Sequence, residues 1–407
     1  MPRRSATLVL AAALLLSGCA KAGDGDAAAA RPASVAGDAV VPASAGPSSA
    51  QLPPMAPTHL EPDCPAPDPD TTVTAAQLNK AMTRLNLPQW NSADIGLTAP
   101  LADGRTVWFW GDTVRKDGVL PRMVGNSILV SSGACFSQVV VDDEKSVLPD
   151  PAAGVTYWPM SVLRFDPGPQ YAPDVTDVLV VLWSRVQRGA RMWDFFLRGT
   201  TASVFTVTAG GPPVMQRLWE MTPDSVDPNH IDWGAASATD DKWIYVYGTR
   251  TTGEAYVYGR ELYVARMPIA DPTNMSALQY WDGTTWQADG GRSAPVIDAI
   301  DGVSQTLTVD HIGDRWVVTS KKGGDLFDEV YLWTSDSPTG PWVTTPVWDQ
   351  AAGFDVGTLS YGPLAHPDVR TASGNLLLSI SRNNTNFAKL IDNPQLGRPL
   401  FTEVPIP

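Results

Sequence analysis

The feature that most constrains the fold is a turn-and-strand unit that recurs five times along the chain. In each unit a turn rich in Asp or Gly precedes a strongly β-prone segment, and the turns begin at positions 103, 177, 240, 313 and 373. The intervals are 74, 63, 73 and 60 residues, and further apolar segments flank each marked one. Four strands per unit without crossover helices are typical of propeller blades. The repeat predicts an all-β, five-bladed β-propeller, whereas a pair of β-sandwiches does not explain the even spacing.

One short helix is expected ahead of the first unit. Residues 74–77 (Thr-Ala-Ala-Gln) have the form of a capping box, and Leu78, Met82 and Leu85 then recur at helical spacing until Pro88. The folded, catalytic domain is therefore placed at residues 72–407.

The first residues have the pattern of an export signal. Arg3 and Arg4 precede a short apolar run, and Leu16-Ser17-Gly18-Cys19 follows it. This ending resembles the bacterial lipobox, in which the cysteine is acylated after cleavage. We expect residues 1–18 to be a lipoprotein signal peptide and Cys19 to carry the lipid, which places the protein at the outer face of the cell membrane. The alternative is an ordinary signal peptide with a chance cysteine.

The segment between the lipid site and the folded domain is expected to be a disordered tether. Residues 19–71 consist mostly of Ala, Pro, Ser, Gly and Asp, and such a composition buries too little apolar surface to offset its ordering entropy. Once Cys19 is assigned to the lipid, Cys64 and Cys135 remain. In an oxidising compartment they either form a disulfide or leave Cys135 as a free buried thiol.

The amino-acid composition limits the kinds of molecule that the protein is expected to bind. The net charge of -14 and pI near 4.6 argue against nucleic-acid binding, which needs a basic surface. Fifteen Trp are many for a core alone, and aromatic rings at a groove mouth stack on sugar faces. We expect a monomer that binds a polysaccharide and contacts the membrane through its lipid.

The residues that carry chemistry should lie where the innermost strands meet at the channel mouth. Asp94 precedes the first marked turn, and Asp112 ends the strand that follows it, 18 residues later. Adjacent antiparallel strands would bring both carboxylates to the same rim. Two carboxylates across a cleft are what glycoside hydrolysis needs. The alternative is that each Asp forms a turn by bonding its own backbone.

A resemblance supports the catalytic interpretation. The motifs Asp94-Ile95-Gly96, Phe109-Trp110-Gly111-Asp112-Thr113 and Gly125-Asn126-Ser127 resemble the opening of a bacterial five-bladed propeller family. That family was long described only as a domain of unknown function and is linked to endo-D-arabinanase activity. The similarity continues in Trp233–Ala236, Tyr245–Thr249, Leu262–Arg266, Tyr280–Trp286, Ser335–Trp342 and Ala365–Pro367.

The resemblance implies roles for particular residues. It makes Asp94 and Asp112 the catalytic pair, and Asn126 either an aid to one of them, a ligand for a sugar hydroxyl or a turn amide. A third acid is common in related propellers, and Glu254 and Glu261 are the candidates, although Glu261 equally has the pattern of a solvated edge charge. The class of mechanism therefore stays open.

Five further side chains are candidates for substrate binding. Neutral imidazole at a channel mouth can bond sugar hydroxyls or hold a carboxylate, and aromatic rings can stack on sugars or fill blade cores. The candidates are His230, His366, Trp158, Trp233 and Tyr361. No cofactor is expected, and no metal site of usual spacing is present in the sequence, although some five-bladed propellers hold a cation in the channel.

Two functions from different classes remain. The first is a surface-tethered glycoside hydrolase, endo-arabinanase-like, that cleaves a furanose polysaccharide such as the D-arabinan of a cell envelope. The second is a non-catalytic propeller lipoprotein that binds glycan or protein. Carboxylates that face one cleft would favour the enzyme, and carboxylates bonded into their own turns would favour the binder.

Overall fold

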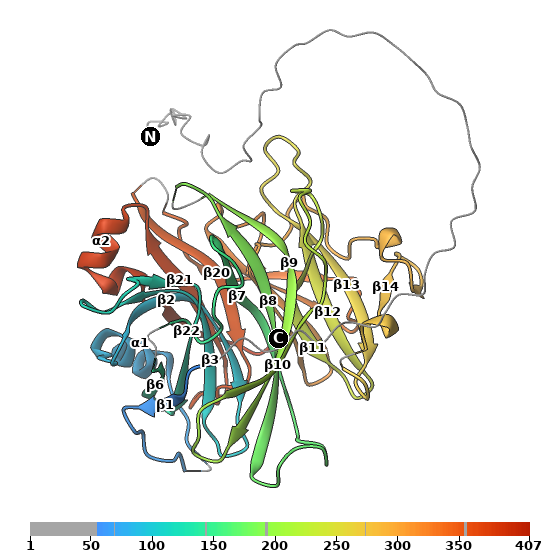
Figure 1. Ribbon diagram of the computed structural model, residues 1–407. Helices are drawn as coiled ribbons and strands as arrows, with labels where there is room; N and C mark the ends of the chain where they lie inside the picture. The colour runs from blue at the N-terminus through green and yellow to red at the C-terminus, as the bar shows by residue number, and fades with distance from the viewer. Residues whose placement is uncertain (1–54, 69, 143–144, 192–193, 273, 354–355) are drawn as a thin grey trace, which may run out of the picture.

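The computed structural model describes residues 55–407 apart from 69, 143–144, 192–193, 273 and 354–355. The predicted signal peptide, Cys19 and most of the predicted tether lie outside the described residues. Five antiparallel sheets make up the domain (Figure 1). Their innermost strands are β2 (Trp90–Pro100), β7 (Val155–Phe165), β11 (Asp232–Thr239), β16 (Thr308–Ile312) and β20 (Thr358–His366). They contact one another in a closed ring, β2 with β7, β7 with β11, β11 with β16, β16 with β20 and β20 with β2. The predicted five-bladed propeller is confirmed.

Blades 1 and 2 come from the first half of the domain. Blade 1 has the order β1-β6-β5-β3-β2 with β4 paired to β3, and its strands are β1 (Thr58–Glu61), β2 (Trp90–Pro100), β3 (Thr106–Arg115), β4 (Met123–Val124), β5 (Ser127–Ser132) and β6 (Cys135–Val141). Blade 2 has the order β10-β9-β8-β7, built from β7 (Val155–Phe165), β8 (Val175–Arg188), β9 (Phe195–Thr208) and β10 (Val214–Glu220).

Blades 3, 4 and 5 follow in chain order. Blade 3 contains β11 (Asp232–Thr239), β12 (Trp243–Arg250), β13 (Glu261–Pro268), β14 (Gln279–Trp281) and β15 (Trp286–Gln287). Blade 4 contains β16 (Thr308–Ile312), β17 (Arg315–Lys321), β18 (Glu329–Ser335) and β19 (Val343–Asp349), and blade 5 contains β20 (Thr358–His366), β21 (Leu376–Asn384) and β22 (Leu400–Val404). The expectation of four strands per unit therefore holds for blades 2 and 4 only.

Short helices complete the described part of the chain. They are α1 (Ala75–Arg84), α2 (Phe387–Asp392) and the 3-10 turns η1 (Met275–Ala277), η2 (Gly290–Arg292) and η3 (Pro394–Gly397). The predicted helix is α1, and the capping box at Thr74 and Gln77 is present. None of the helices among the described residues is long and apolar enough to cross a membrane.

Helix α1 covers the outer edge of blade 5. The side-chain amide of Asn79 donates to the carbonyl of Phe401 (2.9 Å) and accepts from its N–H (2.9 Å). One side chain thus takes the place of a neighbouring strand along β22. Because an uncovered edge strand exposes unpaired backbone groups, this contact protects the three-stranded blade.

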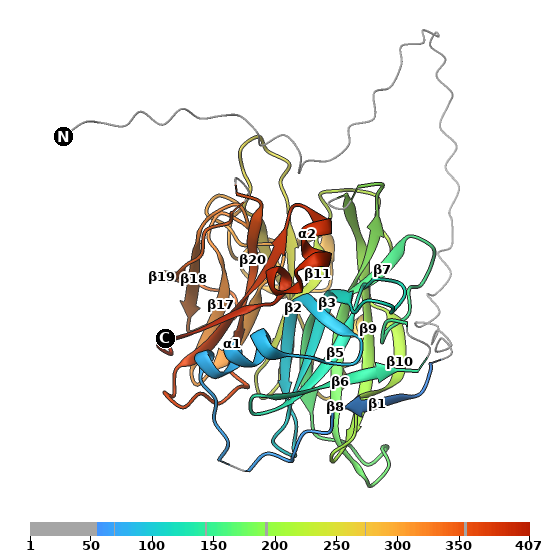
Figure 2. The same ribbon diagram turned by 90° about the vertical axis from the view of Figure 1, so that its left-hand side faces the viewer.

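All five blades share one orientation around the channel. Each innermost strand pairs antiparallel with the second strand of its blade. We name one face of the propeller the start rim. It is the face at which β2, β7, β11, β16 and β20 begin and at which β3, β8, β12, β17 and β21 end, and it is uppermost in Figures 1 and 2.

The blades pack through aromatic cores, and Trp90, Trp108, Trp110, Trp183 and Trp219 are fully buried. Much of the high Trp content is thus core rather than sugar platform.

The structure corrects the end of the predicted tether. Residues Thr58–Glu61 form β1, which pairs antiparallel with β6 at the edge of blade 1. Cys64 and Cys135 form a disulfide that closes a sequence separation of 71 residues. Of the two alternatives for these cysteines, the structure selects the bridge, because β1 and β6 bring their flanking residues together.

Removing this bridge should destabilise the domain. A disulfide mainly restricts the unfolded chain, and a loop of this length predicts a loss of about 2–4 kcal/mol in the free energy of unfolding. We expect the double variant Cys64→Ser/Cys135→Ser to unfold at a lower urea concentration than the oxidised wild type. Reduced wild-type protein is the control and should match the variant. Equal midpoints for oxidised wild type and variant would show that the bridge contributes nothing.

Candidate active site

Asp94 lies at a β-bulge in the innermost strand of blade 1. The pairing of β2 with β3 shifts between Ala93 and Ile95, and Ile95 has a φ of 66°, which is a strained value for a β-branched residue. A bulge re-aims the side chain next to it. Here it places the Asp94 carboxylate against Gly111, where an added Cβ would lie 2.5 Å from Oδ1. Asp94 is thereby set beside Asp112 on the neighbouring strand.

Contacts from blade 5 define the state of Asp94. The hydroxyl of Tyr361 donates to Oδ2 (2.7 Å), and Asn383 donates to the oxygen of that hydroxyl (3.2 Å). Burial above all, and then the negative charge of Asp112, raise the pKa of Asp94 to about 7, although the Tyr361 hydrogen bond and the charge of Arg188 oppose this shift. Oδ1 is buried, and no side chain among the described residues bonds to it. Asp94 is therefore able to hold a proton near neutral pH.

Contacts from blade 2 hold Asp112 through a cation and an indole N–H. Arg188 forms an ion pair with its Oδ1, and the indole N–H of Trp158 donates to the same oxygen (2.7 Å). The Arg188 guanidinium also lies over the Trp158 ring, 4.9 Å from its centroid. The Asp112 side chain remains 18% exposed. Both donors engage Oδ1, and within the described part of the chain this leaves Oδ2 for a reacting group.

The pair therefore combines a carboxyl group that retains a proton with a carboxylate held by a cation. Two neighbouring acids in different environments, one buried and one ion-paired, are typical of acid/base catalysis. The side chains that bond to the two carboxylates come from other blades, and the backbone of Asp112 adds a contact to Asp94 from the neighbouring strand. This arrangement argues against the turn-forming alternative for Asp94 and Asp112.

Three residues of the site were missed by the sequence argument. Arg188 and Asn383 lie at the ends of β8 and β21, the positions equivalent to Asp112 at the end of β3. Asp150 precedes β7, accepts from Thr156 (2.7 Å) and interacts electrostatically with Arg188 and Asp112. The signal was present, because second strands end at the same rim at which innermost strands begin. Among the ends of the second strands, only Asp112 was a predicted site residue.

Two predicted substrate-binding residues prove to be structural. Asn126 is 1% exposed, and its amide donates to the carbonyl of Leu148 (2.9 Å) and accepts from its N–H (2.8 Å). His366 is fully buried, with its ring nitrogens bonded to Thr98 (3.1 Å) and Ser379 (2.7 Å). Burial lowers the pKa of His366 to about 3. The prediction that these two bind sugar is wrong, because their polar atoms are used inside the fold.

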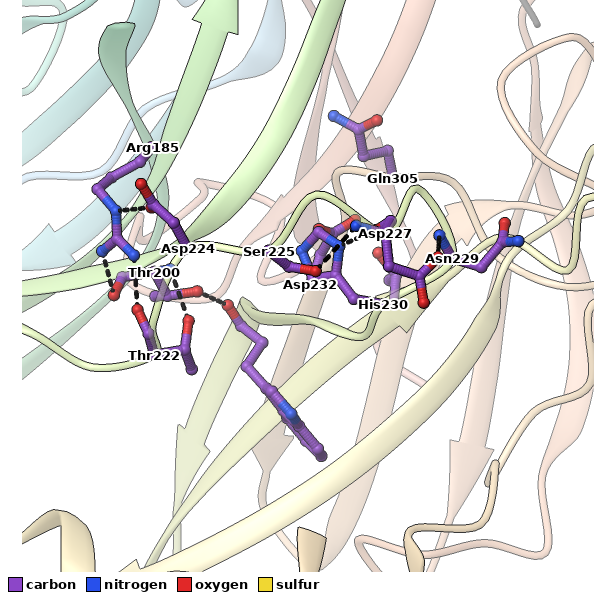
Figure 3. Close-up of polar contacts among 12 residues, drawn as sticks. Arg185, Thr200, Thr222, Asp224, Ser225, Asp227, Asn229, His230, Asp232 and Gln305 are labelled. Carbon is purple, nitrogen blue, oxygen red and sulfur yellow. Dashed lines mark hydrogen bonds and ion pairs between the residues drawn. The ribbon is translucent and has the colours of Figure 1, made fainter. Parts of the chain in front are cut away.

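His230 belongs to the loop between β10 and β11, and Figure 3 shows it beside Asp227 and Asp232. Its Nδ1 bonds the carbonyl of Asp227 (2.6 Å), and its Nε2 lies 3.0 Å from the Asp232 carboxylate. The Asp232 contact, above all, raises the pKa of His230. Both ring nitrogens thus face oxygens of this region, which gives His230 a role in holding the loop.

The remaining aromatic candidates differ in their position relative to the carboxylate pair. Trp158 and Tyr361 lie beside the carboxylate pair, but each contributes its polar atom to a carboxylate. Trp233 packs edge-on against Tyr280, with ring centroids 5.3 Å apart. No described hydrogen bond or ring contact joins Trp233 to Asp94 or Asp112. A stacking role remains a prediction for Trp158 and is not supported for Trp233.

The candidate third acids also separate. Glu254 is exposed in the β12–β13 loop. Glu261 is not the solvated edge charge that was considered, since its side chain is 13% exposed, pairs with Arg250 (2.7 Å) and accepts from the Tyr263 hydroxyl (2.8 Å). Neither contacts the Asp94–Asp112 pair within the described part of the chain. Asp150, by contrast, interacts electrostatically with Asp112 and Arg188.

The central channel contains a cavity of about 250 Å³ lined by all five innermost strands. Asp310 and Asp368 face it, and Oδ2 of Asp310 has no hydrogen-bond partner among the described residues. Carboxylate oxygens are ligands for hard cations, so these two side chains fit a channel cation and would hold it. The described residues contain no group of three His, Cys, Asp or Glu side chains placed to bind a metal. The expectation of no cofactor is untested, and a cation in the channel stays an open alternative.

Solved structures share this fold at low sequence identity. A protein from Bacteroides ovatus ATCC 8483, named as a candidate hydrolase, is 18% identical over 84% of this chain and 93% of that chain, with a TM-score of 0.58. A GH43_1 enzyme from Xanthomonas citri is 16% identical (82% and 93% covered, TM-score 0.41). The catalytic domain of a GH62 α-L-arabinofuranosidase from Coprinopsis cinerea is 12% identical (73% and 86% covered, TM-score 0.39). At these identities the likeness concerns the fold alone.

Sequence comparison places the chain in a family. The comparison with curated proteins returned no match. The model of a family described as a domain of unknown function, DUF5005, matches residues 75–405. That range begins at α1 and includes the last strand of blade 5. The chain therefore belongs to the DUF5005 family.

Proposed function

We propose that this protein is a glycoside hydrolase that cleaves a furanose polysaccharide, with D-arabinan of a cell envelope as the leading substrate. The observation that carries the proposal is the pairing of Asp94, whose pKa is raised to about 7, with Asp112, which is ion-paired to Arg188. Glycosidic cleavage needs one protonated and one ionised carboxyl on the two sides of the bond. The occurrence of glycosidases among proteins of the same fold is compatible with this proposal.

In this proposal Asp94 and Asp112 have different catalytic roles. Asp94 donates its proton to the leaving glycosidic oxygen. Asp112, held through Oδ1, uses Oδ2 either to attack the anomeric carbon or to take a proton from the attacking water. Tyr361 orients Asp94 by its hydrogen bond, and Arg188 and Trp158 orient Asp112. The anomeric configuration of the first product, read by NMR, distinguishes attack by Asp112 from attack by water.

We also propose that the protein is held at the outer face of the cell membrane. An export signal with Cys19 as the lipid site would tether the propeller at the outer face of the membrane. Metabolic labelling with a palmitate analogue tests this, with Cys19→Ser as the control. Label on the wild type alone supports the anchor, and equal label on both excludes Cys19 as the acylated residue.

The activity is tested on the chain without its predicted signal peptide and lipid-site cysteine, residues 20–407. The protein is incubated with purified D-arabinan, arabinogalactan and other envelope glycans, and products are separated by chromatography. Release of oligosaccharides from D-arabinan is the expected result. If a glycan is retained by the immobilised protein but no product forms from any glycan, the non-catalytic binding function replaces this proposal.

The pH profile should report the proton on Asp94. A general acid acts only while protonated, so kcat/KM should fall as pH rises through about 7, the pKa of Asp94. Replacing Tyr361 with Phe removes a hydrogen bond that lowers this pKa. The descending limb of Tyr361→Phe should therefore move to higher pH, by about half a unit or more. A limb that stays in place, or moves to lower pH, would show that it belongs to another group.

A further inference from the structure

The hairpin of β8 and β9 carries an unassigned aromatic residue to the site. These two strands have 14 residues each and end together at the start rim, where they rise side by side (Figure 1). In their register Arg188 is paired directly with Phe195. Because directly paired residues on antiparallel strands project from the same face, Phe195 lies on the face from which Arg188 reaches Asp112.

Phe195 also contacts the second residue that holds Asp112. Its ring packs edge-on against Trp158, with centroids 4.9 Å apart. Trp158 donates to Asp112 Oδ1, and Arg188 lies over its ring. Phe195 is thus one ring away from the carboxylate that is proposed to react.

Unlike Arg188 and Trp158, Phe195 has no polar atom in its side chain, and it is 37% exposed. The next residue, Phe196, is half-buried and packs against His230 at 5.9 Å, toward blade 3. A partly exposed apolar ring at the edge of a polar site leaves apolar surface that a ligand can cover, and covering it is favourable. The C–H face of a sugar ring is a suitable cover.

We propose that Phe195 is a stacking platform for the sugar residue adjacent to the scissile bond, an assignment that rests on the proposed function of Asp94 and Asp112. The ring contributes binding rather than chemistry. It selects glycans that present an apolar face at this position, and it fixes the chain while Asp94 and Asp112 act on the linkage.

The test separates binding from turnover. Phe195→Ala and Phe195→Tyr are prepared in residues 20–407, together with Val214→Ala as an off-site control. Val214 is 47% exposed and lies on β10 opposite Thr206, near the far end of β9. For each protein, kcat and KM are measured on D-arabino-oligosaccharides, and Kd is measured by calorimetry in an Asp94→Asn background.

We expect Phe195→Ala to raise both KM and Kd about three- to tenfold, the range for loss of one aromatic stacking contact. Its kcat should change less than twofold. Phe195→Tyr should restore both constants, because it restores the ring, and Val214→Ala should match wild type.

Each contrary result has a distinct meaning. If Phe195→Ala lowers kcat and leaves Kd unchanged, Phe195 only supports Trp158 and Arg188, and the platform is excluded. Equal constants for Phe195→Ala and wild type also exclude it, while the hydrolase function stands. If wild type binds the oligosaccharides without cleaving them and Phe195→Ala weakens binding, the hydrolase proposal fails and the platform stands. Absence of both binding and cleavage overturns both.

Discussion

Replacing either Asp94 or Asp112 with Asn is expected to lower kcat on D-arabinan by about 1,000-fold or more, since acid/base groups contribute roughly 10²- to 10⁴-fold each. Asn has nearly the same shape but neither donates a carboxylic proton nor attacks. Asp94→Asn removes the proton donor beside Tyr361, and Asp112→Asn removes the carboxylate that Arg188 and Trp158 orient.

Stability measurements distinguish this loss from unfolding. Asp94 is a carboxyl group whose pKa is raised by burial, so its ionised form is disfavoured in the folded protein. An amide at that position removes this cost, and Asp94→Asn should unfold at the same temperature as wild type or higher at pH 8. Asp314→Asn, on an exposed turn between β16 and β17, is the matched control and should keep full activity. Retention of a tenth or more of wild-type kcat by either site variant would remove that residue from the catalytic pair.

Replacing Arg188 with Met should lower kcat/KM by about 100-fold, which corresponds to about 2.7 kcal/mol of transition-state stabilisation. Arg188 pairs with Asp112, and its charge also lowers the pKa of Asp94. Without it, Asp112 loses its orienting cation, and the descending limb of the pH profile should move to higher pH. Breaking a largely buried ion pair on one side leaves the other charge uncompensated, so a lower melting temperature is also expected.

Two variants make the Arg188 prediction specific. Arg188→Lys keeps the charge but loses the planar fork that covers Trp158, and it should recover only part of the activity. Arg191→Met, at the exposed tip of the same hairpin, should behave as wild type because Arg191 pairs only with Asp194 among the described residues. If Arg188→Met retains wild-type kcat/KM, Asp112 does not depend on this ion pair for catalysis.

Strand positions were accessible from the sequence because they depend on local patterns. Each marked turn precedes the second strand of a blade, and β3, β8, β12, β17 and β21 all lie where the pattern placed them. The capping box before α1 is likewise a local signal. The outer strands were less predictable. Strand β1 falls in a segment with the composition of a linker, and it forms only because β6 offers a partner edge.

The two imidazoles show why site residues were harder to predict. His230 precedes β11 at the start rim and braces a loop there, whereas His366 is the last residue of β20, at the opposite end of the channel, and is buried between Thr98 and Ser379. Residue type alone did not reveal this difference, because the burial of a side chain depends on the blade packed beside it. Asn126 was misassigned for the same reason.

The sequence by itself determined the number of blades, the leading helix and the rim on which Asp94 and Asp112 lie, because turn chemistry and strand periodicity are local properties. Only the tertiary structure decided what surrounds that pair. Tyr361 is 267 residues from Asp94, and Arg188 is 76 residues from Asp112. Ring closure brings blades 5 and 2 to either side of blade 1. As a result, the surroundings of the two carboxyl groups differ in burial and charge. No local pattern encodes that difference, since it arises between blades.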